Sequence, residues 1–243
     1  MTSANATPRS STAEGSRAAG LRLQRRALKV HEKLLDAFGP PTWRNPLPPI
    51  DELVSTILSQ NTNDLNRDRA YTALCGQFPT WENVRDAKQA DVIAAIRVAG
   101  LANQKGPRIQ NVLREITAER GNLDLAFLKD LPLEEARSWL MRFHGVGPKT
   151  AAIVLQFSLD RPAFPVDTHI YRVTGRIGLR PLKMNVERAH VHLEKLFTPE
   201  TYYAAHLNLI RLGREVCHPR KPDCPHCPVR QLCDYEPKTR RSA

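Results

Sequence analysis

Apolar residues recur at intervals of three or four positions along most of this chain, the spacing that places them on one face of an α-helix. One stripe covers residues 28–38 and ends at Gly39, and another covers residues 109–116 and ends before Gly121. Glycine suits a helix end because it adopts the left-handed backbone conformation. Strict alternation of apolar and polar residues, which would predict strands, is nearly absent. The pattern predicts an all-α protein of roughly ten short helices.

Residues 1–20 and 236–243 lack such stripes. The N-terminal segment is rich in Ser, Thr and Ala, with Glu14 as its one acidic residue. It has too little apolar surface to offset the entropy lost on ordering, so we expect a disordered tail at each end. The N-terminal composition also suits an organellar transit peptide if the source is a eukaryote.

The net charge points to the partner. The 243-residue chain carries 36 Lys and Arg against 25 Asp and Glu, a formal net charge of +11. Such an excess favours a polyanion, and nucleic acid rather than a membrane surface. A role of the extra lysines and arginines in solubility alone would also account for the positive charge. No apolar run approaches the ~18 residues that a membrane-spanning helix needs, so we expect no membrane association.

Four cysteines crowd residues 217–233, a segment with no room for a core of its own. They are Cys217, Cys224, Cys227 and Cys233, in the pattern Cys-x6-Cys-x2-Cys-x5-Cys. Four thiolates so close together predict a metal centre, and disulfides are disfavoured because no secretory signal precedes them. His218 and His226 suit zinc, whereas Cys-Pro steps are typical of some iron–sulfur segments. Spacing alone leaves both metals open.

Residues 140–151 predict a helix, a tight turn and a second helix. Gly145 and Gly147 permit a left-handed backbone and close approach, and Pro148 fits the first turn of the second helix. Backbone N–H groups at that helix start form an anion site that needs no side-chain charge. We expect Val146 to fill the gap between the helices. An ordinary helical hairpin without a ligand has the same pattern.

The motifs together resemble those of a known family. The segment from His144 to Thr150 is similar to the helix-hairpin-helix of the endonuclease III superfamily of DNA glycosylases. Residues 165–170 resemble that family's catalytic-aspartate motif, and the cysteine run resembles its [4Fe–4S] loop. The resemblance covers about residues 28–235. It therefore favours an iron–sulfur cluster over zinc.

The resemblance implies that Lys149 and Asp167 are catalytic. The neutral amine of Lys149 would attack the sugar C1′ of a flipped nucleotide and form a Schiff base that drives β-elimination. Lowering an ordinary lysine pKa of ~10.4 to a working value of ~7–8 requires about 3–4 kcal/mol. Asp167 would stabilise positive charge on the sugar and relay the lysine proton. Without the resemblance, Asp167 ahead of an apolar helix is more simply an N-cap.

Residues 57–64 and 100–105 resemble two loops that enter the minor groove. The expected DNA contacts are Gln60, Asn61, Asn103, Lys105, Gly145, Val146, Gly147, Arg220 and Lys221. Arg220 and Lys221 lie in the basic loop between the first two cysteines, which the cluster would hold in place. Two positions depart from the family pattern: His144 stands where proline is usual, and the wedge glutamine aligns with Asn61.

The domain organisation also follows from the resemblance. It implies two helical domains with a DNA-binding cleft between them. Residues 43–160 would form a six-helix domain that carries the hairpin, and residues 21–42 with 161–235 a discontinuous domain that holds the [4Fe–4S] cluster. We expect a monomer, cytoplasmic and nucleoid-associated in a bacterium, or nuclear or mitochondrial in a eukaryote.

The function implied is base excision repair. A bifunctional DNA glycosylase and AP lyase would remove damaged bases, with oxidised pyrimidines the family expectation, and nick duplex DNA at the abasic site. One alternative is a monofunctional mismatch glycosylase, for adenine, thymine or uracil, on the same scaffold. The other is a non-catalytic DNA-binding module in which the cysteines hold zinc.

Overall fold

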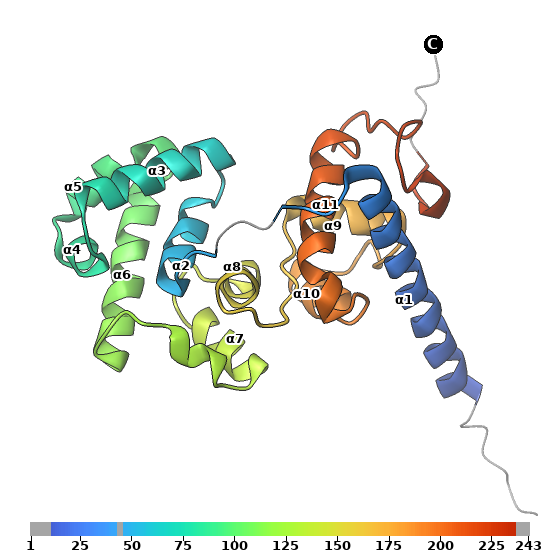
Figure 1. The fold of residues 1–243 in the computed structure, drawn as a ribbon, viewed down its shortest axis with the longest axis horizontal. Helices are drawn as coiled ribbons and strands as arrows, with labels where there is room; N and C mark the ends of the chain where they lie inside the picture. The colour runs from blue at the N-terminus through green and yellow to red at the C-terminus, as the bar shows by residue number, and fades with distance from the viewer. Residues whose placement is uncertain (1–10, 43–45, 237–243) are drawn as a thin grey trace, which may run out of the picture. The chain divides into compact units, whose positions relative to one another are not determined.

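The computed structural model describes residues 11–42 and 46–236, and over these ranges it contains helices and no strand. The all-α prediction is confirmed. The chain divides into two compact units (Figure 1). Trp43–Pro165 form the first, called here the hairpin unit. Met1–Thr42 and Val166–Ala243 form the second, called here the cysteine unit.

The hairpin unit contains seven α-helices in its described part. They are α2 (Pro49–Leu58), α3 (Asp64–Gln77), α4 (Trp81–Asp86), α5 (Gln89–Ala95), α6 (Ala102–Arg120), α7 (Leu133–Met141) and α8 (Pro148–Ile153). Single turns of 3-10 helix occur at Arg97–Ala99 and Ala126–Lys129, and a π-helical turn at Val154–Ser158 continues α8.

Helix α2 lies at the centre of this unit and contacts α3, α6 and α8 (Figure 1). Its apolar side chains Leu53, Ile57 and Leu58 are completely buried. Burial of such a side chain stabilises the fold by roughly 1.5–3 kcal/mol. The C-terminal end of α2 is therefore fixed by packing, and so is the start of the loop that follows it.

Residues 119–131 join α6 to α7 and belong to the core. Gly121 ends α6 with a left-handed φ of 75°. Leu125 and Leu128 are buried, and the Phe127 ring meets Trp139 of α7 edge to face with ring centroids 5.0 Å apart. The segment therefore braces α7, the first helix of the hairpin.

The cysteine unit combines both ends of the chain. Its helices are α1 (Ser11–Phe38), α9 (Thr168–Ile177), α10 (Val186–Glu194) and α11 (Tyr202–Glu215), with 3-10 turns at Pro199–Thr201 and Arg230–Leu232. Helix α11 packs against both α1 and α9 (Figure 1). The N-terminal helix thus completes the layer on which the cysteine segment rests.

The tail predicted over residues 1–20 is wrong for its second half. Helix α1 begins at Ser11, while residues 1–10 and 237–243 lie outside the described residues. Ala18, Ala19 and Gly20 are exposed, so tertiary burial does not order this stretch. High alanine propensity and continuity with the packed part of α1 account for the helix. In the described part of the chain, none of the helices has both the length and the hydropathy to cross a membrane.

Candidate functional site

The hairpin turn has the geometry that its glycines predict. Gly145 has a left-handed φ of 85°, and the Val146 N–H donates to the Phe143 carbonyl at 3.0 Å. Gly147 is extended and precedes Pro148, the first residue of α8, so no side chain caps this helix. A Cβ at Gly147 would meet nothing within 4 Å, which leaves its outer surface open to a close approach.

Val146 fills the gap inside the hairpin, as expected. Its side chain is 4% exposed and belongs to the core of the unit. A contact of this residue with DNA would therefore use its backbone. His144, beside the turn, is exposed.

Lys149 is the second residue of α8 and is half-buried. Because α8 starts at Pro148, the lysine lies in the first helical turn, two residues after Gly147. Thr150, Ala151 and Ala152 behind it are buried. The backbone of Lys149 is therefore held by a packed helix, while its side chain is partly exposed to solvent.

Asp167 is the residue before α9 in the cysteine unit and caps the N-terminus of this helix. Its Oδ1 accepts a hydrogen bond from the Ile170 N–H at 2.7 Å, the geometry of an N-cap. Two residues further, the His169 ring nitrogen Nδ1 lies 3.2 Å from Arg172 Nη2. Lys149 and Asp167 thus come from different units, and their cooperation stays a prediction.

The Lys105 side chain is buried and not available to DNA, so its predicted contact is wrong. The side chain is 1% exposed, and its Nζ donates to the carbonyls of Leu58, at 2.7 Å, and Ala99, at 2.9 Å. Burial, and then the charge of Arg108, lower the pKa of Lys105 to about 8. The ammonium group connects the end of α2 to the end of the 3-10 turn at Arg97–Ala99. The sequence pattern could not distinguish this buried lysine from an exposed cation in a loop.

Two other predicted contacts in these loops face solvent. Asn61 and Asn103 are exposed, and Asn61 has a left-handed φ of 51°. Leu101, which lies in the second of these segments but was not among the expected contacts, also has a φ of 51° and is 46% exposed. An apolar side chain held in water by an unfavourable backbone conformation is a candidate for insertion between bases.

Gln60 contacts the hairpin. Its Nε2 donates to the Gly145 carbonyl at 3.0 Å, and its Oε1 accepts from Arg108 Nη1 at 2.6 Å. The loop after α2, the start of α6 and the hairpin turn therefore meet through side-chain hydrogen bonds within one unit. A contact of Gln60 with DNA stays a prediction.

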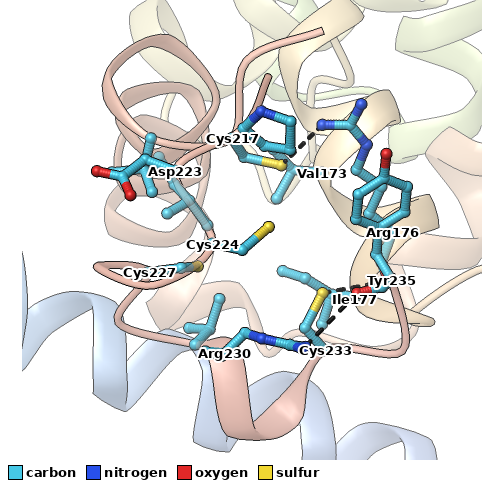
Figure 2. A pocket seen from close by; sticks show the side chains of 14 residues that line it. Val173, Arg176, Ile177, Cys217, Asp223, Cys224, Cys227, Arg230, Cys233 and Tyr235 are labelled. Carbon is cyan, nitrogen blue, oxygen red and sulfur yellow. Dashed lines mark hydrogen bonds between the residues drawn. The ribbon is translucent and has the colours of Figure 1, made fainter. Parts of the chain in front are cut away.

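The four cysteines line one pocket of the cysteine unit, and Figure 2 shows their sulfur atoms around it. Its walls include the apolar side chains of Val173, Ile177, Leu212, Val216 and Val229. Burial raises the pKa of the Cys227 and Cys233 thiols. Binding a metal there would therefore displace the protons of these two thiols.

Four thiols around one pocket are a donor set that both an iron–sulfur cluster and a zinc ion accept. Among the described residues, no three His, Cys, Asp or Glu side chains gather closely enough to hold one metal ion. A [4Fe–4S] cluster takes each thiolate on a different iron, so its ligands can stand farther apart than around zinc. His218 and His226 are not among the pocket-lining residues, and His226 Nδ1 instead contacts the Asp223 carboxylate at 2.8 Å.

Two arginines of α9, missed from the sequence, hold the cysteine segment. Arg172 donates to the carbonyls of Cys217 and Gly213. Arg176 donates to the His218 carbonyl at 2.7 Å and to Cys217 Sγ at 3.3 Å, and Figure 2 shows the latter bond. The two arginines are one helical turn apart and therefore lie on the same face of α9. This spacing is the sequence signal that could have identified them. Helix α9 thus links the Asp167 cap to the cysteine pocket.

Arg220 and Lys221 are exposed, as their predicted role requires. Lys221 has a left-handed φ of 52°, and Arg176 Nη2 donates to the Pro219 carbonyl at 2.9 Å. The basic loop is therefore anchored at its base while its two cations face solvent.

Comparison with known proteins gives consistent matches. Residues 54–199 match the family described as HhH-GPD superfamily base excision DNA repair protein. An Arabidopsis thaliana relative named as a DNA glycosylase, At3g47830, is 38% identical over 165 residues, 68% of this chain and 56% of its own length. Endonuclease III of Sulfolobus acidocaldarius is 34% identical over 186 residues, 75% of this chain and 80% of the relative. The chain spans little more than half of the plant relative.

Solved structures agree with these matches. A non-covalent endonuclease III–DNA complex and a trapped endonuclease III–DNA covalent intermediate each superpose with a TM-score of 0.75 and 25% identity. Each covers 87% of this chain and 95% of the solved chain.

The buried Lys105 predicts a pH-dependent stability. Its pKa is about 8 in the folded chain and ~10.4 in an unfolded one, so between these values the unfolded chain binds more protons and rising pH stabilises the fold. Lys105→Met loses this effect and orphans two carbonyls. We expect the difference in melting temperature between wild type and Lys105→Met to be positive at pH 7.5 and to widen at pH 9.5.

Thermal unfolding of both proteins across this range measures the effect. Lys88→Met, which removes an exposed lysine of the same unit, is the matched control. A difference that stays constant or narrows with pH contradicts the burial of a titrating ammonium group.

Proposed function

The chain belongs to the HhH-GPD superfamily of base excision DNA repair proteins, and from this premise we propose that it is a DNA glycosylase with AP lyase activity. The observation that carries the proposal is Lys149, a lysine in the first turn of α8 and two residues after the open turn at Gly147. A monofunctional enzyme needs no amine there. The trapped covalent intermediate of endonuclease III is a precedent for covalent chemistry on this fold.

DNA binding would use the backbone first. A phosphate fits the open surface at Gly147 and the N-terminal end of α8, where the peptide dipoles attract an anion. Exposed Asn61, Leu101 and Asn103 would enter the minor groove and separate the stacked bases. Flipping the damaged nucleotide then brings its sugar to the lysine.

The covalent step requires a neutral amine. Lys149 Nζ would attack C1′, the glycosidic C–N bond would break, and the base would leave with its electron pair and a proton. The C1′–O4′ bond then breaks, O4′ takes up a proton, and the opened sugar carries an iminium between C1′ and Nζ. This iminium acidifies the C2′ proton, whose removal expels the 3′ phosphate by β-elimination. The helix terminus disfavours the ammonium form by at most ~2 kcal/mol, so exclusion of water by the bound DNA must supply the rest.

Asp167 would stabilise the positive charge that develops on the sugar and relay the lysine proton. A carboxylate beside the amine also favours the ammonium form, so its benefit must lie in the transition state. The hydrogen bond from the Ile170 N–H fixes one carboxylate oxygen and leaves the other for this task.

Cys217, Cys224, Cys227 and Cys233 would hold a [4Fe–4S] cluster. The cluster would supply a covalent staple for the segment, with no part in base release. Arg172 and Arg176 connect the same segment to α9, so the staple also fixes the helix that Asp167 begins. Quantifying iron and acid-labile sulfide against zinc in the purified protein tests this assignment directly.

The substrate we propose is duplex DNA that contains an oxidised pyrimidine. A panel of duplexes, each with one defined lesion, scored for base release and strand nicking, tests it. Release and nicking at oxidised pyrimidines support the proposal. Release at an adenine, thymine or uracil mismatch without nicking supports a monofunctional enzyme instead, and binding with neither reaction supports a DNA-binding module.

Loss of the amine separates chemistry from binding. Lys149→Ala should abolish the borohydride-trapped adduct on lesion-bearing DNA, because no Schiff base can form, while binding to the same duplex stays measurable. Lys129→Ala, which removes an exposed lysine of the same unit, is the control and should trap normally. An adduct that persists in Lys149→Ala places the nucleophile on another residue.

Asp167→Asn separates the two roles of the carboxylate. Asparagine caps a helix as well as aspartate does, so the melting temperature should hardly change. The base-release rate should fall by about 100-fold or more, because the negative charge is lost. Asp167→Ala, which also removes the cap, should lower stability by about 1 kcal/mol in addition. A wild-type rate in Asp167→Asn would reduce this residue to a cap.

The basic loop predicts a change in salt dependence. Replacing both Arg220 and Lys221 by glutamate should weaken duplex binding and lower the slope of log affinity against log salt by about one unit for each phosphate that the loop no longer neutralises. The same charge change at exposed Lys183 and Arg188, in the same unit, is the matched control. Equal slopes in both double variants argue against a specific interaction of the loop with DNA.

A further inference from the structure

The side chains of Gln60 and Arg108 have no part in the reaction proposed above, yet both contact the hairpin turn. Resting on that proposed function, we propose that they are positioning residues that fix the Gly145 turn to the loop after α2. Two DNA-facing segments would then meet the duplex as one preformed surface. The residues act through the backbone that they hold, and neither touches the reacting atoms.

The hydrogen bonds form a continuous chain. Arg108 Nη1 donates to Gln60 Oε1 at 2.6 Å, and Gln60 Nε2 donates to the Gly145 carbonyl at 3.0 Å. A glutamine amide presents one donor group and one acceptor group, so it can connect a cation to a carbonyl. The bond to Arg108 orients the amide, and the amide in turn holds the peptide that follows Gly145.

Arg108 also packs on the turn. A Cβ at Gly145 would overlap with Nε and Cδ of Arg108, so the arginine side chain occupies the space that any residue other than glycine would need. With a φ of 85°, Gly145 is held from two directions, by a hydrogen bond on its carbonyl and by the arginine beside its Cα.

The position of Arg108 carries a cost in folding stability. Its Nε is buried and has no hydrogen-bond partner among the described residues. An unsatisfied buried donor destabilises the folded state, so this placement is poorly explained by stability alone. Positioning of the turn explains both the contact with Gly145 and the bond to Gln60.

Lys105 also fixes the start of the loop after α2. Its Nζ donates to the carbonyl of Leu58, the last residue of α2. Lys105 and Arg108 both project from the start of α6, so one rigid helix holds the end of α2, the amide of Gln60 and the hairpin turn. The surface is therefore set before DNA arrives, which reduces the ordering cost of binding.

The test uses Gln60→Met, Arg108→Met and the double variant of the full-length protein. Amide hydrogen exchange of the peptide that spans residues 143–147 is measured without DNA. Each single variant should exchange about tenfold faster in this peptide, while peptides of α2 and α6 stay protected. The double variant should add little to either single change, because both break one chain of contacts.

Two further variants sharpen the result. Gln60→Glu keeps an acceptor for Arg108 and loses the donor to Gly145, so it should behave like Gln60→Met. Gln77→Met makes the same change at an exposed glutamine of the same unit and should exchange like wild type. Because Gln60 is half-exposed, its variants are expected to fold.

DNA binding is the second readout. Affinity for a duplex with a non-cleavable abasic analogue should fall about fivefold or more in both single variants. Unchanged exchange at residues 143–147 overturns the proposal, and so does faster exchange with unchanged affinity. The exchange measurement needs no lesion, so a chain that proves inactive on every duplex would refute the proposed function and leave this result standing.

Discussion

The left-handed backbone at Gly145 is the constraint on which the hairpin depends. Its φ of 85° turns the chain between α7 and α8, and Arg108 fills the space where a Cβ would stand. Gly147 then leaves an open surface and Pro148 starts α8, which places Lys149 in the first helical turn. The position of the Lys149 backbone is thus set by the geometry of the turn, by burial of Val146 and by the contacts of Gln60 and Arg108 with Gly145.

In the cysteine unit, residues 217–233 are likewise held in place by contacts from a neighbouring helix. A chain of this length, without regular structure between its short turns, cannot bury enough apolar area to hold itself in place. Arg172 and Arg176 bond its carbonyls and one sulfur to α9, and the four thiols share one pocket. A cluster bound to these thiols would complete the attachment of the segment that carries Arg220 and Lys221.

Periodicity and turn chemistry predicted the fold well, because both act locally. The stripe over residues 109–116 lies inside α6, Gly121 ends that helix, and Val146 fills the hairpin. The errors arose where tertiary contacts decide. Lys105 has the sequence signature of a loop cation, but packing turns it inward onto two carbonyls. The bonds from Gln60 to Gly145 and Arg108 join residues far apart in sequence, and no local pattern marks them.

The central claim is that the amine of Lys149 becomes covalently attached to DNA during base removal. Reduction of the reacting mixture with borohydride, proteolysis and mass spectrometric sequencing of the DNA-linked peptide would identify the attached residue. We expect a peptide from the start of α8 with a sugar remnant on Lys149 Nζ. Attachment to another lysine or to the N-terminal amine, in a protein that releases the base, would contradict this claim.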